Sequence, residues 1–327
     1  MGKVVNKESV FWLLLTRRKR KYYCNSNAYG VLLSQESDMR MKKKTFIFIL
    51  VLAAIMAAVF CGCEKKGDEA EVIETADGYV VVKCEVKKGN ANIYGELYVP
   101  AEKKDSYPLV ILSHSAFMKG RALKAYAAGF AERGYLAYTF DFCGGGYSSK
   151  SDGDMKDMTI FTEKDDLNAV IDYFGGRSDV KKEEIFLCGT SQGGLVSALV
   201  ANDRNDDIAG LILMYPAFNI ADQVNDYDVA EGAEDFLPVG KGYFDTLKDF
   251  DVFAHIGSFK KPVVIIHGTH DTTVPVSYSE QAAEVYENCV LRTISGGIHG
   301  FNPDNYSIMK NYDTEVWKYI DEYLQTL

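Results

Sequence analysis

From residue 79 to the end of the chain, short apolar runs alternate with longer segments whose apolar residues recur at helical spacing. Residues 109–113 (LVILS) form an almost continuous apolar run, as expected for a strand buried on both faces. One face of an expected helix over 163–174 carries Leu167, Val170, Ile171 and Phe174. This alternation predicts an α/β fold with a mostly parallel sheet and helices on both faces.

The expected strands and helices leave one long segment unassigned. The strands are 79–86, 93–99, 109–113, 136–142, 184–189, 208–215, 263–267 and 290–294, and the helices are 123–133, 163–174, one that begins after Ser191, and 314–324. The segment 218–260 is about twice as long as a crossover needs, and it is rich in acidic and aromatic residues. We expect it to form a cap over the carboxyl edge of the sheet, where the parallel strands end.

The chain before residue 78 has a different character. Residues 45–60 are uncharged and almost wholly apolar, and Lys42, Lys43 and Lys44 precede them. This pattern is typical of a signal peptide and is short for a membrane-spanning helix, although an uncleaved membrane anchor is the alternative. A signal peptide begins near the start of its protein, so residues 1–40 are expected to be an upstream extension, with Met41 or Met39 as the true start.

A cysteine follows the apolar run. Gly62 precedes Cys63, and a small residue before a cysteine at this place resembles the lipobox of bacterial lipoproteins. The resemblance implies that 41–63 is a lipoprotein signal peptide and that Cys63 carries the lipid; Cys61 is the weaker candidate because the bulky Phe60 precedes it. We therefore expect a domain over 78–327, joined by a polar linker over 64–77 to a lipid anchor on the extracytoplasmic face of the cell membrane.

The net charge of the chain excludes some classes of binding partner. The first 63 residues hold 11 basic and 3 acidic residues, which leaves 25 basic and 43 acidic residues in the remainder. The net charge of that remainder is −18, compared with −10 for the whole chain. Such an acidic body argues against binding to nucleic acid or to anionic lipid.

The sharpest motif is Gly189-Thr190-Ser191-Gln192-Gly193, a G-x-S-x-G sequence between an expected strand and an expected helix. The glycines let the strand and the helix approach closely, so the serine lies on a tight turn at the edge of the sheet. Ser191 is the predicted nucleophile. The backbone N–H of Gln192, at the amino end of the helix, is a predicted oxyanion donor.

A serine nucleophile needs a base, and the base needs a carboxylate to orient it. His299 lies after the last expected strand and is the predicted base. Asp271 follows the strand 263–267 and is the predicted acid, because the order serine, aspartate, histidine is the one such folds use. The rival position, after the strand 208–215, offers no carboxylate before Asp222. His114 is better placed to shape a loop than to act as a base.

The second oxyanion donor is expected in the loop after the strand 109–113. The backbone N–H of Ala116 is the first candidate there and that of Phe117 the second. The glycines at 144–146 lack the Lys-Ser/Thr pair of a phosphate-binding loop, and the cysteines show no spacing typical of zinc. These residues therefore indicate neither a phosphate-binding loop nor a zinc site.

Several segments together resemble the bacterial cinnamoyl and feruloyl esterases of the α/β-hydrolases, together with their serine-peptidase-like relatives, over roughly residues 80–325. The segments are the His114 loop, 140–146, 158–174, 189–194, the cap, 267–275 and 296–301. The resemblance implies ester hydrolysis without a metal ion or an organic cofactor, and cap contacts of Tyr227 and Tyr243 with an aromatic acyl group. Ser115 departs from the glycine usual there, which would narrow the acyl pocket or perturb the donor.

The expected function is hydrolysis of carboxylic esters with small or aromatic acyl groups, such as hydroxycinnamoyl esters, through an acyl-enzyme. The expected ligand is therefore a small-molecule ester. A lipase, a thioesterase or a serine peptidase on the same triad are the alternatives. An inactive, ligand-binding lipoprotein is the alternative from another class, and the complete set of Ser191, Asp271 and His299 argues against it.

Overall fold

The computed structural model describes residues 71–226, 238–301 and 312–327. The apolar run 45–60, the cysteine expected to carry a lipid, Cys63, and Tyr227 of the cap lie outside these residues. Within them, no helix is both long enough and apolar enough to cross a membrane.

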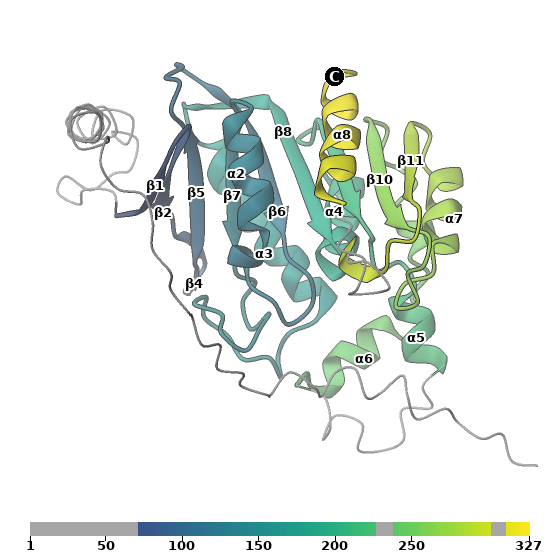
Figure 1. The fold of residues 1–327 in the computed structure, drawn as a ribbon. Helices are drawn as coiled ribbons and strands as arrows, with labels where there is room; N and C mark the ends of the chain where they lie inside the picture. Colours follow the sequence, from purple (N-terminus) through teal and green to yellow (C-terminus); the bar gives the residue numbers. More distant parts are fainter. Residues whose placement is uncertain (1–70, 227–237, 302–311) are drawn as a thin grey trace, which may run out of the picture. The chain divides into compact units, whose positions relative to one another are not determined.

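A nine-stranded sheet forms the centre of the described part, in the order β1-β2-β5-β7-β6-β8-β9-β10-β11 (Figure 1). Its strands are β1 (Val72–Ala76), β2 (Tyr79–Lys83), β5 (Gly95–Pro100), β6 (Tyr107–Ser113), β7 (Leu136–Phe140), β8 (Val180–Thr190), β9 (Gly210–Met214), β10 (Val263–Gly268) and β11 (Cys289–Ile294). The strands from β7 to β11 in that order pair in parallel, and β1, β2 and β5 add antiparallel pairs at one side. The expected α/β fold with a mostly parallel sheet is confirmed.

Helices cover both faces of the sheet. They are α2 (Lys124–Glu132), α3 (Ile160–Gly175), α4 (Gln192–Asp203), α5 (Ile220–Asp226), α6 (Lys241–Leu247), α7 (Ser277–Val285) and α8 (Asp313–Leu324). Leu109 and Ile111 of β6 face a core shared with α3, α4 and α7, while Val110 and Leu112 face a core shared with α2 and α8. This alternation follows from the two-residue period of a strand, and it explains why the central strands read as continuous apolar runs.

Local signals set some boundaries beyond the apolar pattern. The helix expected at 163–174 begins earlier, at Ile160, because Thr159 and Thr162 form a reciprocal cap. The Thr162 backbone N–H donates to Thr159 Oγ1 at 3.0 Å, and the Thr159 backbone N–H donates to Thr162 Oγ1 at 2.9 Å. Two donors that the helix itself leaves unpaired are thereby satisfied.

Two expectations at the start of the domain are corrected. Residues 72–76 were expected within a linker but form β1, an edge strand that pairs with β2. Edge strands are half exposed, so the polar residues of β1 resemble a linker in sequence; Glu74 contacts Lys124 of α2 at 2.7 Å. The single strand expected at 79–86 is divided, because β3 (Val86–Lys88) leaves the main sheet and pairs with β4 (Ala91–Ile93).

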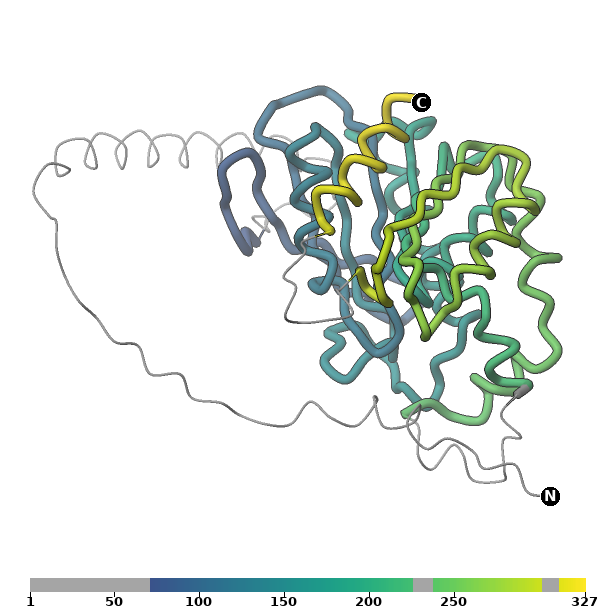
Figure 2. The backbone as a smooth tube through the Cα atoms, turned by 45° about the vertical axis from the view of Figure 1, so that its right-hand side comes forward, coloured from purple at the N-terminus to yellow at the C-terminus, as the bar shows by residue number. Residues whose placement is uncertain are grey.

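The described parts of the segment between β9 and β10 lie at the edge of the sheet where the parallel strands end. Its described helices, α5 and α6, lie beyond that edge in both views (Figures 1 and 2). The nucleophile candidate Ser191 directly follows β8 and therefore lies at the same edge. The helices α5 and α6 and Ser191 are consequently at the same edge of the sheet.

Candidate active site

Ser191 occupies a strained turn between β8 and α4. Its φ is 50° and its ψ is −119°, a conformation that costs a residue with a side chain about 1–3 kcal/mol. Gly189 and Gly193 permit the turn, because a Cβ on Gly189 would collide with the carbonyl of Gly193 and a Cβ on Gly193 with the carbonyl of Ser113. The two glycines of the motif are thus required by the close approach of strand and helix.

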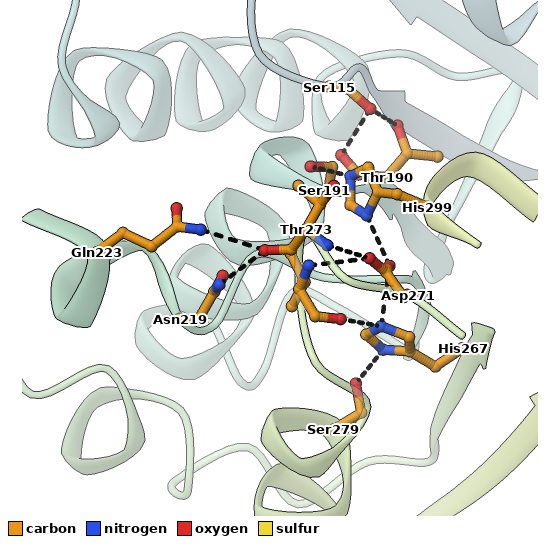
Figure 3. Close-up of polar contacts among 11 residues, drawn as sticks. Ser115, Thr190, Ser191, Asn219, Gln223, His267, Asp271, Thr273, Ser279 and His299 are labelled. Atoms are coloured by element: carbon orange, nitrogen blue, oxygen red, sulfur yellow. Dashed lines mark hydrogen bonds and ion pairs between the residues drawn. The ribbon is translucent and has the colours of Figure 1, made fainter. Parts of the chain in front are cut away.

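His299 connects Ser191 to Asp271 (Figure 3). Its Nε2 lies 3.0 Å from Ser191 Oγ, and its Nδ1 lies 2.7 Å from Asp271 Oδ2. An ionised carboxylate only accepts hydrogen bonds, so Nδ1 carries the proton and Nε2 is left to accept the serine hydroxyl. The structure therefore brings the three predicted residues together in the arrangement that activates a serine.

Asp271 accepts hydrogen bonds on both of its oxygens. Oδ1 accepts the backbone N–H groups of Thr273 and Val274, each at 2.9 Å, while Oδ2 accepts from His299 and, at 3.2 Å, from His267 Nε2. Burial by itself would raise the pKa of this carboxyl group. The hydrogen bonds from the two histidines outweigh burial and hold the pKa well below its usual value, so Asp271 is ionised at neutral pH.

His267 is a site residue that the sequence did not assign to the site. Its Nδ1 lies 2.7 Å from Ser279 Oγ (Figure 3). Its Nε2 lies 2.9 Å from the carbonyl oxygen of Val274. A carbonyl only accepts, so the proton is on Nε2, where it also faces Asp271. The spacing of four residues from His267 to Asp271, after a buried strand, was the available signal.

The segment expected to form the cap also contacts the turn that carries Asp271. Asn219 and Gln223 each donate a side-chain N–H to the carbonyl oxygen of Thr273, at 3.0 and 3.1 Å (Figure 3). The rival acid Asp222, from the same segment, instead accepts from the Tyr278 hydroxyl at 2.7 Å. Asp222 thus contacts α7, while Asn219 and Gln223 on either side of it hold the turn that carries Asp271.

The loop expected to supply the second oxyanion donor leaves the sheet beside the nucleophile, because Ser113 of β6 pairs with Gly189 of β8. His114 shapes this loop: its Nδ1 donates to the carbonyl of Ser115 at 2.8 Å, and its Nε2 accepts the backbone N–H of Phe142 at 3.1 Å. Burial lowers the pKa of His114, so the ring is neutral and both of its nitrogens are occupied.

The two candidate donors in that loop follow Ser115. Ala116 is the next residue, and Phe117 has a φ of 61° and bridges to Gly146 of the glycine turn. Ser115 itself turns toward the residue before the nucleophile, since its hydroxyl donates to Thr190 Oγ1 at 3.0 Å (Figure 3). The departure from glycine at this position is therefore accommodated against β8.

The Asp141 carboxylate joins the segment after β6 to the segment after β7. Its Oδ1 accepts the backbone N–H of Gly120, and its Oδ2 accepts that of Lys150, both at 2.8 Å.

Among the described residues, no group of three or more His, Cys, Asp or Glu side chains is placed to hold a metal ion.

Of the two tyrosines expected to contact substrate, only Tyr243 is described. It is 7% exposed, and its hydroxyl donates to Gln192 Oε1 at 2.7 Å. Gln192 Nε2 donates in turn to Glu163 Oε2 at 2.8 Å. Tyr243 thus contacts the residue after the nucleophile, a partner that the pattern of aromatic residues in the cap did not indicate.

Comparison with known proteins agrees with this architecture. Residues 104–248, which include Ser191 but end before Asp271, match the family described as serine aminopeptidase, S33. A search of curated proteins finds no match.

Solved structures give broader coverage. Est1E from Butyrivibrio proteoclasticus, solved with ferulic acid bound, is 26% identical with a TM-score of 0.65, over 74% of this chain and 99% of that one. Acetyl xylan esterase 1 from Thermoanaerobacterium sp. is 16% identical with a TM-score of 0.56, over 79% of this chain and 88% of that one. The nine-stranded sheet, its helices and these likenesses together show that this chain has the α/β-hydrolase fold.

Proposed function

We propose that this chain is a serine hydrolase that cleaves carboxylic esters through an acyl-enzyme on Ser191. The observation that carries the proposal is the continuous hydrogen-bonded chain from Ser191 through His299 to Asp271, with contacts of 3.0 and 2.7 Å. Asp271 orients the imidazole and stabilises it when it is protonated, which leaves Nε2 facing the serine hydroxyl.

The reaction takes place in two stages. His299 Nε2 takes the proton of Ser191 Oγ as the oxygen attacks the ester carbonyl, and the oxyanion forms where the backbone N–H groups of Gln192 and Ala116 can donate to it. The intermediate collapses, the C–O bond breaks, and the alcohol leaves with the proton from His299. Water then attacks the acyl-enzyme with His299 as base, which releases the acid and restores Ser191.

Esters with small or aromatic acyl groups, including hydroxycinnamoyl esters, are the proposed substrates. The likeness to Est1E, whose solved structure holds ferulic acid, supports this class. A serine peptidase is the second candidate, because residues 104–248 match the family described as serine aminopeptidase.

The test compares the wild-type protein with Ser191→Ala and a matched control, Ser197→Ala, on p-nitrophenyl esters, methyl hydroxycinnamates and aminoacyl p-nitroanilides. Ser197 lies in α4 and its buried hydroxyl has no hydrogen-bond partner among the described residues, so this variant should keep wild-type activity. The proposal fails if wild type is no faster than Ser191→Ala on every ester. Faster cleavage of the anilides than of the esters would favour the peptidase.

A fluorophosphonate probe distinguishes the remaining alternative. Labelling of wild type and of Ser197→Ala, but not of Ser191→Ala, is expected of an active hydrolase. Absence of labelling in all three would instead favour a ligand-binding protein without catalysis.

We also propose that Cys63 carries a lipid that holds the domain at the extracytoplasmic face of the cell membrane. The apolar run 45–60 and Gly62 before the cysteine support this. Metabolic labelling with an alkyne fatty acid in a bacterial host should mark the wild-type chain but not Cys63→Ala. Equal labelling of both chains would contradict the proposal.

A further inference from the structure

The side chain of Gln192, the residue after the nucleophile, is held at both ends. Its Nε2 donates to Glu163 Oε2 at 2.8 Å, and its Oε1 accepts the Tyr243 hydroxyl at 2.7 Å. Gln192 and Glu163 are each 1% exposed and Tyr243 is 7% exposed. A buried amide that lost its hydrogen-bond partners would cost free energy, so these two contacts fix the orientation of the Gln192 side chain.

The contacts come from two separate elements. Glu163 lies in the first turn of α3, and Tyr243 lies in α6 of the segment between β9 and β10. Gln192 is the first residue of α4, where the helix supplies no acceptor for its backbone N–H. A residue held by its side chain from both directions also has its backbone orientation held.

We infer that Glu163 and Tyr243 are positioning residues that hold Gln192 so that its backbone N–H points at the oxyanion. The inference rests on the proposed esterase function. It assigns α6 a part in the chemistry, because loss of the Tyr243 contact would loosen the oxyanion donor without touching the substrate or the triad.

Glu163 gives this arrangement a pH dependence. Complete burial raises the pKa of its carboxyl group to about 8; the Gln192 hydrogen bond works against this, and the charge of Asp166 adds to it. Oε1 has no hydrogen-bond partner among the described residues, so nothing there compensates a negative charge. The carboxyl group is therefore neutral at pH 7.

The other groups around Glu163 leave that conclusion intact. Asp166 lies one turn along α3, where Lys88 of β3 pairs with it and the Cys143 backbone N–H donates to it at 2.7 Å. The Tyr243 hydroxyl on α6 has its own pKa raised far above neutrality by burial, so it stays protonated. Ionisation of Glu163 would thus add an uncompensated negative charge behind the residue that must stabilise the oxyanion.

The experiment measures kcat and KM for p-nitrophenyl acetate from pH 6 to 10 in wild type, Tyr243→Phe, Glu163→Gln and Tyr286→Phe. Tyr286→Phe is the matched control, because it also removes one buried hydroxyl, and this one has no partner among the described residues. Titration with a fluorophosphonate counts the active molecules in each sample, so that a fall in kcat is separated from a fall in folded protein.

Tyr243→Phe should lower kcat about tenfold, less than the 10²–10³-fold typical of losing an oxyanion donor outright, with KM within about twofold. Tyr286→Phe should match wild type. In wild type kcat should fall as the pH rises through about 8. Glu163→Gln should lack that fall, while its kcat at pH 7 drops by about threefold or less because an amide can still accept from Gln192.

A stability measurement gives a readout independent of catalysis. Glu163 has a folded-state pKa above its unfolded value of 4.5, so its stabilising contribution is present below pH 4.5 and is lost as the pH rises toward 8. The melting temperature of Glu163→Gln should therefore rise relative to wild type across that range and then level off.

Three results would overturn the inference. One is equal kcat for Tyr243→Phe and Tyr286→Phe, and another is the same alkaline fall in Glu163→Gln as in wild type. The third is an absence of Ser191-dependent hydrolysis in wild type, which would remove the proposed function and with it the reaction that Glu163 and Tyr243 serve.

Discussion

Replacing Asp271 with asparagine changes one oxygen for an NH₂ group at almost constant volume. The two oxygens of Asp271 have different donors: two backbone N–H groups on Oδ1, and two histidines on Oδ2. The backbone donors cannot change, so the oxygen that asparagine retains must stay on their side. Its NH₂ group then faces His267 and His299.

Neither histidine can accept this change without cost. The Val274 carbonyl holds the proton of His267 on Nε2, so an N–H there would oppose the new NH₂ group. His299 would have to accept at Nδ1, which moves its proton to Nε2 and leaves it unable to take the proton of Ser191. The wrong tautomer of the base costs about 10⁴-fold in kcat, or about 5.5 kcal/mol of transition-state stabilisation. The opposed buried donors should lower the free energy of unfolding by roughly 1–3 kcal/mol.

The assay is kcat on a p-nitrophenyl ester at pH 7, with the free energy of unfolding measured in urea. Asp222→Asn is the matched control, because Asp222 is the rival acid by position and contacts Tyr278 rather than either histidine. It should keep kcat within about twofold. Asp271→Asn with more than a tenth of wild-type kcat, or Asp222→Asn with an equal loss, would refute the assignment of the acid.

Two further substitutions test the surroundings of the triad. His267→Leu removes one hydrogen-bond donor to Asp271 and leaves Ser279 Oγ and the Val274 carbonyl without their imidazole partner. Steady-state kinetics should show kcat/KM about tenfold lower, and urea titration a free energy of unfolding lower by about 2 kcal/mol. An unchanged kcat/KM would show that His267 has no part in orienting the acid. Ser115→Gly should keep the ratio of kcat/KM for acetyl and cinnamoyl esters within about twofold of the wild-type ratio, because the Ser115 hydroxyl donates to Thr190. A tenfold change in that ratio would place Ser115 in the acyl pocket.

The parts predictable from the sequence are those that a local pattern determines. The strand before Ser191, the helix after it and the flanking glycines are adjacent in the chain, so the turn at the nucleophile followed from a dozen residues. The meeting of Asp271 and His299 beside Ser191 followed from chain order together with the rule that parallel strands end at one edge. Each of these inferences needs only the fold and not the packing of side chains.

The parts that could not be predicted depend on contacts between distant segments. Helical spacing shows that Glu163 lies in a helix, but it does not show that this carboxyl group meets Gln192, 29 positions later. Tyr243 and Gln192 are 51 positions apart, and an aromatic residue in a cap packs inward as readily as it lines a pocket. The strand β1 could not be predicted for a different reason. Its half-exposed residues lack the apolar alternation of a buried strand.

At the end of β9, the rival position for the acid, an aromatic residue lies beside His299. Tyr215 lies at the end of β9 in a backbone conformation with a φ of 39°, which its chain neighbours alone would not favour. Its ring meets the imidazole of His299 edge to face at 4.8 Å between centroids and packs in the same way against Phe301. The Tyr215 ring, which itself packs against Phe301, therefore supports the imidazole from the β9 side, while Asp271 accepts from Nδ1 in the turn after β10. At this rival position, the side chain that contacts His299 is thus an aromatic ring rather than a carboxylate.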